Sequence, residues 1–356
     1  RNGSPVAECG HAKSVGASCR SLDDKGSLCW SGMMRRGRRV LLATWDGGGN
    51  IPPIAALAGA LSSRGDEVVV LGHGTTREVF ERAGCTFVDW ASTSQPRSTR
   101  EFMPPAEDMA YAVEHVFYNT SYQTDLRPAI EELAPDVVMV DVSLNYAIVE
   151  SLRAQTPLLV LCHVVYALVA GGDDVTNPNF AELSRAAARD RVPEFSSQRE
   201  MMDMADGVVV TSYEGFDPLP AGANVLHVGP LRPPSATSTD WRRRSPDKQL
   251  VLVSLSTSAQ TQTPLLQRLC DACGQLDIEA LVTTGPALAS DTLTTAANVT
   301  AVDFADHGDV LPQTDLVVTH AGLGTVLAAL AHGVPMLCTP LGRDQPFNAA
   351  RVADLG

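Results

Sequence analysis

Residues 315–356 carry the pattern that most constrains the fold, because they contain two strand–turn–helix units in succession. In the first unit, the apolar and β-branched run 316–319 is typical of a buried parallel strand. A tight glycine turn at 320–325 follows, and then a helix is expected over 326–331. The second unit repeats the order of strand, polar turn and helix over 336–356. Consecutive units of this kind require a parallel sheet with helices packed on its faces.

The glycine turn at 320–325 has the chemistry of an anion site. Gly322 and Gly324 let the backbone approach a ligand closely, and the free N–H groups at the start of the next helix point towards it. Thr325 adds a hydroxyl and His320 adds an imidazole. A diphosphate fits this set of groups, although from the turn alone a glycine used only for packing accounts for it equally well.

The same alternation continues through the rest of the chain and predicts an α/β fold. A strand at 40–44 is followed by a glycine-rich turn at 45–53 and a helix at 54–61. In a doubly wound parallel sheet such turns lie at the carboxyl ends of the strands, where ligands bind. A second series of strands and helices begins at Leu250, after a stretch at 231–247 rich in Pro, Ser, Thr and Arg. We therefore expect an N-terminal domain at 39–230, a linker at 231–247 and a C-terminal domain at 248–356, with a ligand cleft between the domains.

Composition excludes several classes of partner. The chain has 356 residues, which is room for two domains, and a net charge of −14 argues against nucleic acid. Its longest apolar run, 158–170, is too short to span a membrane. The eight cysteines show no disulfide framework, which favours a reducing, cytoplasmic compartment. Residues 1–38 lack apolar periodicity and are expected to be a disordered or spurious leader, with a functional basic arm as the alternative.

The turn and the residues after it resemble the donor-site motif of the UDP-glycosyltransferase superfamily (glycosyltransferase family 1). The resemblance is specific because many residues match in order and spacing: His320-Ala321-Gly322-Leu323-Gly324-Thr325, Gly333-Val334-Pro335, Pro340, Asp344-Gln345, Asn348-Ala349 and Gly356. It implies a GT-B fold, in which two Rossmann-like domains face each other across a cleft, and similarity to bacterial macrolide and antibiotic glycosyltransferases. In that family the second domain continues beyond the position of Gly356, so the chain is expected to be truncated at its C-terminus.

The resemblance also implies a donor site. His320, the N–H groups of 322–325 and the Thr325 hydroxyl would hold the diphosphate of a UDP- or dTDP-sugar without a metal or other cofactor. Asp344 and Gln345 would bind sugar hydroxyls. The segment that holds the nucleobase matches Phe304, Ala305 and His307, with Phe304 stacking on the base and Asp306 standing where the family has proline. A polar turn with Ser256 and Thr257 would reach a phosphate or ribose.

The catalytic base is where the chain departs from its family. The usual histidine in the turn after the first strand is replaced by Asn50, whose amide cannot accept a proton. Asp141 matches the carboxylate that normally orients that histidine. We hypothesise that Asp141 is the base, directly or through water, and that Asn50 positions the acceptor. Asp46 and His163 are reserve candidates that would also contact the acceptor, although a turn cap and a pocket-wall residue are equally ordinary roles for them.

The aromatic stretch after residue 100, which includes Tyr118, would supply both packing and an acceptor-pocket wall. The predicted function is that of an inverting, metal-independent glycosyltransferase acting on a small, apolar, hydroxylated acceptor. Two alternatives remain open: a non-catalytic nucleotide-sugar-binding homologue, suggested by Asn50, and a GT-B sugar epimerase. The sequence leaves the oligomeric state open.

Overall fold

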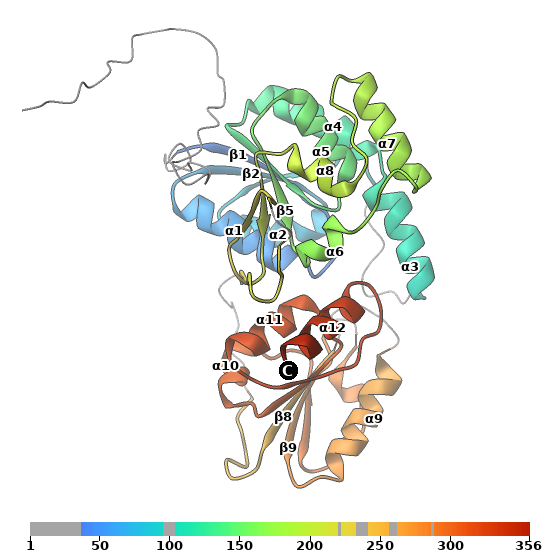
Figure 1. Cartoon of the computed structure of the whole chain (residues 1–356). Helices are drawn as coiled ribbons and strands as arrows, with labels where there is room; N and C mark the ends of the chain where they lie inside the picture. Colours follow the sequence, from blue (N-terminus) through green and yellow to red (C-terminus); the bar gives the residue numbers. More distant parts are fainter. Residues whose placement is uncertain (1–36, 95–103, 220–221, 233–240, 256–261, 286–287) are drawn as a thin grey trace, which may run out of the picture. The chain divides into compact units, whose positions relative to one another are not determined.

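The computed structural model describes residues 37–94, 104–219, 222–232, 241–255, 262–285 and 288–356 (Figure 1). The predicted leader, apart from its last two residues, therefore lies outside the described residues. So do Ser256 and Thr257, and their predicted donor contacts stay predictions.

A parallel sheet of seven strands organises the first half of the chain. Its strands are β1 (Arg39–Ala43), β2 (Glu67–Gly72), β3 (Thr86–Asp89), β4 (Val137–Asp141), β5 (Leu158–Cys162), β6 (Gly207–Val210) and β7 (Val225–His227). The order β3-β2-β1-β4-β5-β6-β7 reverses direction between β1 and β4. In doubly wound folds that reversal opens a crevice at the carboxyl ends of the two strands. The turn after β1 and the end of β4 consequently lie next to each other.

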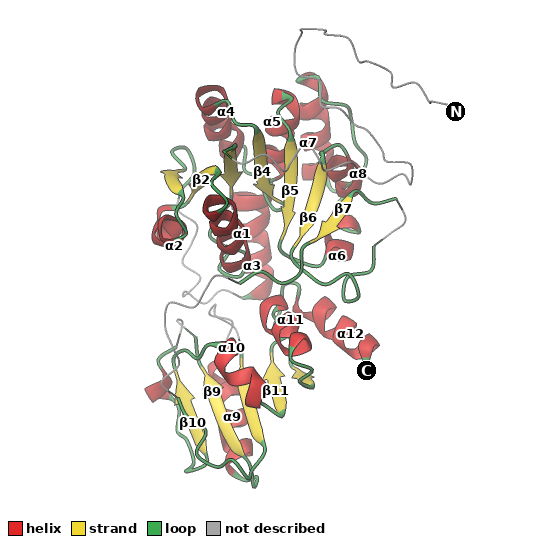
Figure 2. Cartoon of the chain, turned by 90° about the vertical axis from the view of Figure 1, so that its left-hand side faces the viewer, coloured by secondary structure: helices red, strands yellow, loops and turns green. Residues whose placement is uncertain are grey.

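Helices cover this first sheet (Figure 2). They are α1 (Ile51–Ser63), α2 (Arg77–Arg82), α3 (Pro105–Ala112), α4 (Ser121–Leu133), α5 (Asn145–Ala154), α6 (Tyr166–Ala170), α7 (Pro178–Arg189) and α8 (Gln198–Asp203), with a 3-10 turn at Gly74–Thr76 and a π-helical turn at Val113–Phe117. One buried cluster joins alternate strand residues, such as Val138 and Val140, to apolar residues of α4, α5, α7 and α8. Burying both faces of the sheet explains why the strands read as continuous apolar runs.

A second parallel sheet, of five strands, organises the rest. Its strands are β8 (Leu250–Ser254), β9 (Glu279–Thr283), β10 (Val299–Val302), β11 (Leu316–Thr319) and β12 (Met336–Cys338), in the order β10-β9-β8-β11-β12. Its helices are α9 (Thr263–Gly274), α10 (His307–Val310), α11 (Leu323–Ala331) and α12 (Gln345–Leu355), with 3-10 turns at Ser290–Thr292 and Leu311–Gln313. Val251 and Val253 pack with α9, whereas Leu250 and Leu252 pack with α10 and α11. Alternate residues of β8 face opposite sides of the sheet and therefore belong to two different buried clusters.

Two helices begin earlier than the sequence pattern suggests. Helix α1 starts at Ile51, and its Pro52 and Pro53 occupy the first turn, where a missing N–H costs nothing. Helix α11 starts at Leu323, so Gly324 lies in the first helical turn and not in a loop. Both differences bring helix N-termini closer to the carboxyl ends of the strands than expected.

The boundaries of the two predicted domains stay a prediction, since residues 37–356 form one unit. The first sheet ends at His227 and the second begins at Leu250, so the predicted linker lies between the sheets in sequence. A further buried cluster contains Val165 and Phe216 from the first half together with Leu323 and Val326 of α11. In the part of the chain that the structure describes, no helix combines the length and apolar character needed to cross a membrane.

Candidate functional site

A cavity of about 2070 Å³ is lined by turns that follow the carboxyl ends of strands in both sheets. It is lined by most of the predicted site residues: Asp46, Asn50, His163, Phe304, Ala305, His307, His320, Gly322, Gly324, Thr325, Asp344 and Gln345. Two predicted residues, Asp141 and Tyr118, are not in its lining. The fold therefore brings the donor motif and the turn after β1 to one cavity, as the parallel topology requires.

The N-terminus of α11 forms the centre of the predicted diphosphate site. Gly322 is its N-cap, and the N–H groups of Leu323 and Gly324 precede the first carbonyl of the helix, whereas the N–H of Thr325 donates to the carbonyl of Gly322 at 3.0 Å. The ring of His320 lies directly against Gly322, because a Cβ added there would come within 2.6 Å of Nε2. Burial lowers the pKa of His320 to about 4, so the imidazole is neutral at pH 7 and can serve the site as a hydrogen-bonding group.

The predicted nucleobase segment presents an aromatic face. Phe304 follows β10, an edge strand of the second sheet, and is 61% exposed, whereas Ala305 is buried. His307 Nε2 lies 3.2 Å from Ser254 Oγ, and burial lowers the pKa of His307 to about 4. Asp306, which replaces the family's proline, is the N-cap of α10 and accepts a hydrogen bond from the N–H of Gly308 at 2.7 Å. The carboxylate of Asp306 therefore caps α10 at the position where the family has proline, and the Phe304 ring remains exposed.

Asp344 and Gln345 line the cavity but also shape the loop that carries them. Gln345 Oε1 accepts hydrogen bonds from the N–H groups of Leu341 and Gly342, at 2.8 and 3.0 Å. Asp344 Oδ2 accepts a hydrogen bond from Asn348 Nδ2, which also donates to the carbonyl of Ala321. Asn348 thus ties the loop that carries Asp344 to the turn at 320–325. The predicted sugar contacts of Asp344 and Gln345 remain predictions.

One cavity residue escaped the sequence reasoning. Arg232 donates from Nη2 to the carbonyl of Gly324 at 2.9 Å, which places a guanidinium beside the start of α11. Partial desolvation by the surrounding chain lowers its pKa, although the residue keeps exposed surface. In the sequence Arg232 lies in the predicted linker among other arginines, so no local signal distinguished it. A cation at a helix N-terminus is unfavourable for the helix dipole, and an anion bound between them would relieve that repulsion.

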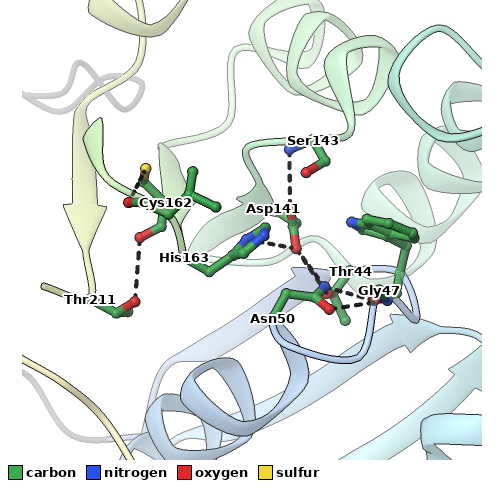
Figure 3. Close-up of polar contacts among 10 residues, drawn as sticks. Thr44, Gly47, Asn50, Asp141, Ser143, Cys162, His163 and Thr211 are labelled. Atoms are coloured by element: carbon green, nitrogen blue, oxygen red, sulfur yellow. Dashed lines mark hydrogen bonds and ion pairs between the residues drawn. The ribbon is translucent and has the colours of Figure 1, made fainter. Parts of the chain in front are cut away.

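The turn after β1 and the end of β4 meet around Asp141, as predicted (Figure 3). Asp141 is fully buried, and its Oδ2 accepts hydrogen bonds from Asn50 Nδ2 at 2.9 Å and Thr44 Oγ1 at 3.3 Å. Its Oδ1 accepts one from the N–H of Ser143 at 2.9 Å. His163 Nδ1 lies 3.4 Å from Oδ2. The carboxylate is covered by these partners and is not among the residues that line the cavity. The hypothesis that Asp141 is the base, directly or through water, stays a prediction.

The two remaining predicted acceptor residues have different outcomes. Asp46 lines the cavity and caps its turn, since Oδ1 accepts a hydrogen bond from the N–H of Gly48 and Oδ2 accepts one from Thr75 Oγ1. Tyr118 does not line the cavity, so the structure gives no support to its predicted acceptor contact. Its hydroxyl donates to Asp173, and burial together with this bond raises the pKa of Tyr118. From the same aromatic stretch, Tyr111 and Phe117 form part of the wall instead.

Known proteins match this architecture. Residues 267–356 match the C-terminal domain family of erythromycin biosynthesis protein CIII-like proteins. The chain is 28% identical over 335 residues to the elloramycin glycosyltransferase ElmGT of Streptomyces olivaceus, which covers 89% of the chain and 84% of that protein. It is 36% identical over 129 residues to demethyllactenocin mycarosyltransferase of Streptomyces fradiae, covering 36% of the chain but only 28% of that relative. The solved structure of the glycotransferase of kitacinnamycin superposes with a TM-score of 0.73 at 21% identity, over 91% of the chain and 85% of that structure.

Two parallel α/β sheets with this topology, matched by solved glycosyltransferases, define the GT-B fold. The predicted GT-B fold is therefore confirmed, and the chain is similar to glycosyltransferases such as the elloramycin glycosyltransferase, in agreement with the predicted resemblance.

Proposed function

We propose that this protein transfers a sugar from a UDP- or dTDP-sugar to a hydroxyl of a small, apolar acceptor. The observation that carries the proposal is the convergence, on one cavity, of the N-terminus of α11, the exposed ring of Phe304 and the turn after β1. The helix start suits a diphosphate and the ring suits a nucleobase. The wall formed by Met109, Tyr111, Ala112 and Phe117 suits an apolar acceptor.

The chemistry requires stabilisation of negative charge on the leaving diphosphate. N–H groups of α11, the neutral imidazole of His320 and the guanidinium of Arg232 are placed to supply it. We propose that these groups make a metal ion unnecessary, so transfer should be unchanged in excess EDTA. We also propose a single displacement with inversion at the anomeric carbon, which the anomeric coupling constant of the product would reveal by NMR.

Relatives that are named for sugar transfer favour this function over a binding-only homologue or an epimerase. A thermal-shift screen with UDP, dTDP, GDP and their glucose conjugates tests the donor part, because a ligand that binds only the folded chain raises its melting temperature. We expect UDP or dTDP to give the largest shift. His320→Ala should weaken that nucleotide by about tenfold or more, the loss expected for one hydrogen bond to a charged group. Equal affinity in the variant would refute the diphosphate site.

A further inference from the structure

Asp141 has the environment of a group that orients a base and not of one that contacts substrate. Its side chain has no exposed surface. In the described residues, the groups that donate hydrogen bonds to it are an amide, a hydroxyl and a backbone N–H, all of them uncharged. A buried carboxylate held only by neutral donors favours a positive charge that develops beside it.

Asn50 cannot act as the base, because an amide does not accept a proton and both its nitrogen and its oxygen are already hydrogen-bonded. Its Nδ2 donates to Asp141 and to the carbonyl of Trp45, at 2.9 and 2.8 Å, and its Oδ1 accepts from the N–H of Gly47. Asp46 is likewise engaged with Gly48 and Thr75. The turn after β1 therefore shapes the cavity without offering a free proton acceptor.

The residue that follows the neighbouring strand, β5, is a histidine. Strands β4 and β5 pair with Asp141 opposite Leu161, so the residue two positions after Leu161 returns to the same side of the sheet. That residue is His163, whose ring faces Asp141 and lines the cavity (Figure 3). Its side chain is 12% exposed, whereas that of Asp141 is 0% exposed. The imidazole thus lies between the buried carboxylate and the cavity.

We propose that His163 is the general base of the transfer reaction and that Asp141 is its positioning residue. This inference rests on the proposed function and names the base for it. In the family that the chain resembles, this aspartate pairs with a histidine at the position of Asn50; here it faces the histidine that directly follows β5. The Nδ1–Oδ2 separation of 3.4 Å is longer than a good hydrogen bond, and such contacts commonly shorten when substrate binds.

The proposed step conserves atoms and charge. With its proton on Nδ1 facing Asp141, His163 accepts the proton of the acceptor hydroxyl at Nε2. The acceptor oxygen forms a bond to the anomeric carbon as the bond from that carbon to the diphosphate oxygen breaks, and the electron pair leaves with the diphosphate. The imidazolium that results is stabilised by the Asp141 carboxylate and then releases its proton to water.

Two phenols of similar size, used as acceptors, distinguish a general base from a residue that has only a structural role. Most 4-nitrophenol is ionised at pH 8 and needs no base, whereas 4-methylphenol keeps its proton. In His163→Gln, the new amide can still donate to Asp141 but cannot accept a proton. With UDP-glucose or dTDP-glucose as donor, we expect kcat for 4-methylphenol to fall by about 10²-fold or more and kcat for 4-nitrophenol to fall far less.

His227→Gln is the matched control, because His227 Nε2 lies 3.6 Å from the buried carboxylate of Asp217 in the same half of the chain but not in the cavity wall. It should leave both rates near wild type. Equal losses with both phenols in His163→Gln, or an unchanged rate with 4-methylphenol, would overturn the assignment. A second variant, His163→Asn, should show the same selectivity. If the wild-type chain neither binds UDP and dTDP nor transfers to either phenol, the proposed function itself fails.

Discussion

Substitution of Gly322 by alanine tests the geometry of the diphosphate turn. The backbone at Gly322 has φ −62° and ψ 134°, which alanine adopts freely, so no backbone strain is introduced. The added Cβ, however, would lie 2.6 Å from Nε2 and 2.7 Å from Cε1 of His320. Ordinary contact begins at 3.4 Å, so the ring must retreat by 0.8 Å, the difference between 3.4 and 2.6.

The cost of that movement follows from the burial of the ring. His320 is 9% exposed, and crowding a packed site typically costs about 1–3 kcal/mol. We expect Gly322→Ala to lower the free energy of unfolding in urea by this amount. It should also weaken UDP or dTDP by about tenfold in isothermal titration calorimetry, because the displaced imidazole loses its alignment with the helix N-terminus.

Gly324→Ala is the matched control at the same turn. Its Cβ meets no described atom within 4 Å, and it lies inside α11, where alanine is favoured over glycine by up to about 1 kcal/mol. The control should therefore be as stable as the wild type or slightly more stable. If Gly322→Ala unfolds at the same urea concentration as Gly324→Ala and binds nucleotide like the wild type, the contact between His320 and Gly322 does not exist.

Two further predictions concern two buried histidines and Arg232. Burial lowers the pKa of His73 and of His320 from 6.5 to about 4, so between these pH values the unfolded chain binds more protons than the folded chain. Stability should therefore be complete above about pH 6.5 and fall towards pH 4, by at most about 3 kcal/mol for each histidine; urea midpoints that do not change over this range would contradict it. Separately, Arg232→Gln should weaken UDP or dTDP by about tenfold at low salt, with a smaller loss at 1 M salt, as measured by calorimetry. An affinity equal to that of the wild type at low salt would remove Arg232 from the donor site.

Local patterns were enough to predict the architecture and to place the turn His320–Thr325 at the edge of the sheet where the cavity lies. Apolar β-branched runs alternating with helices specify parallel sheets, and the carboxyl ends of such strands meet at one edge whatever the details of the packing. The turn His320–Thr325 is therefore predictable from its place in the alternation, whereas Phe304 is indicated only by the family resemblance. The family motif then supplied the roles that spacing alone left open.

Helix starts were less predictable, because they depend on partners outside the local pattern. Glycine and proline at positions 322, 324, 52 and 53 suggested loops, yet the structure includes three of the four in the first turns of α11 and α1 and makes Gly322 an N-cap. A first turn needs no N–H partners within the helix, so residues that disfavour a helix interior are tolerated there.

Tertiary structure alone decided which groups are available for chemistry. The sequence identified Asp141 and His163 as separate candidates, twenty-two positions apart, and could not rank their exposure. Pairing of β4 with β5 sets the two side chains together, and the turn after β1 covers the carboxylate while leaving the imidazole at the cavity. Tyr118 is predicted to line the cavity because the sequence does not show which way its side chain points. In the structure its hydroxyl donates a hydrogen bond to Asp173. Burial depends on what the rest of the chain places over a residue, and that is a property of packing that no local pattern contains.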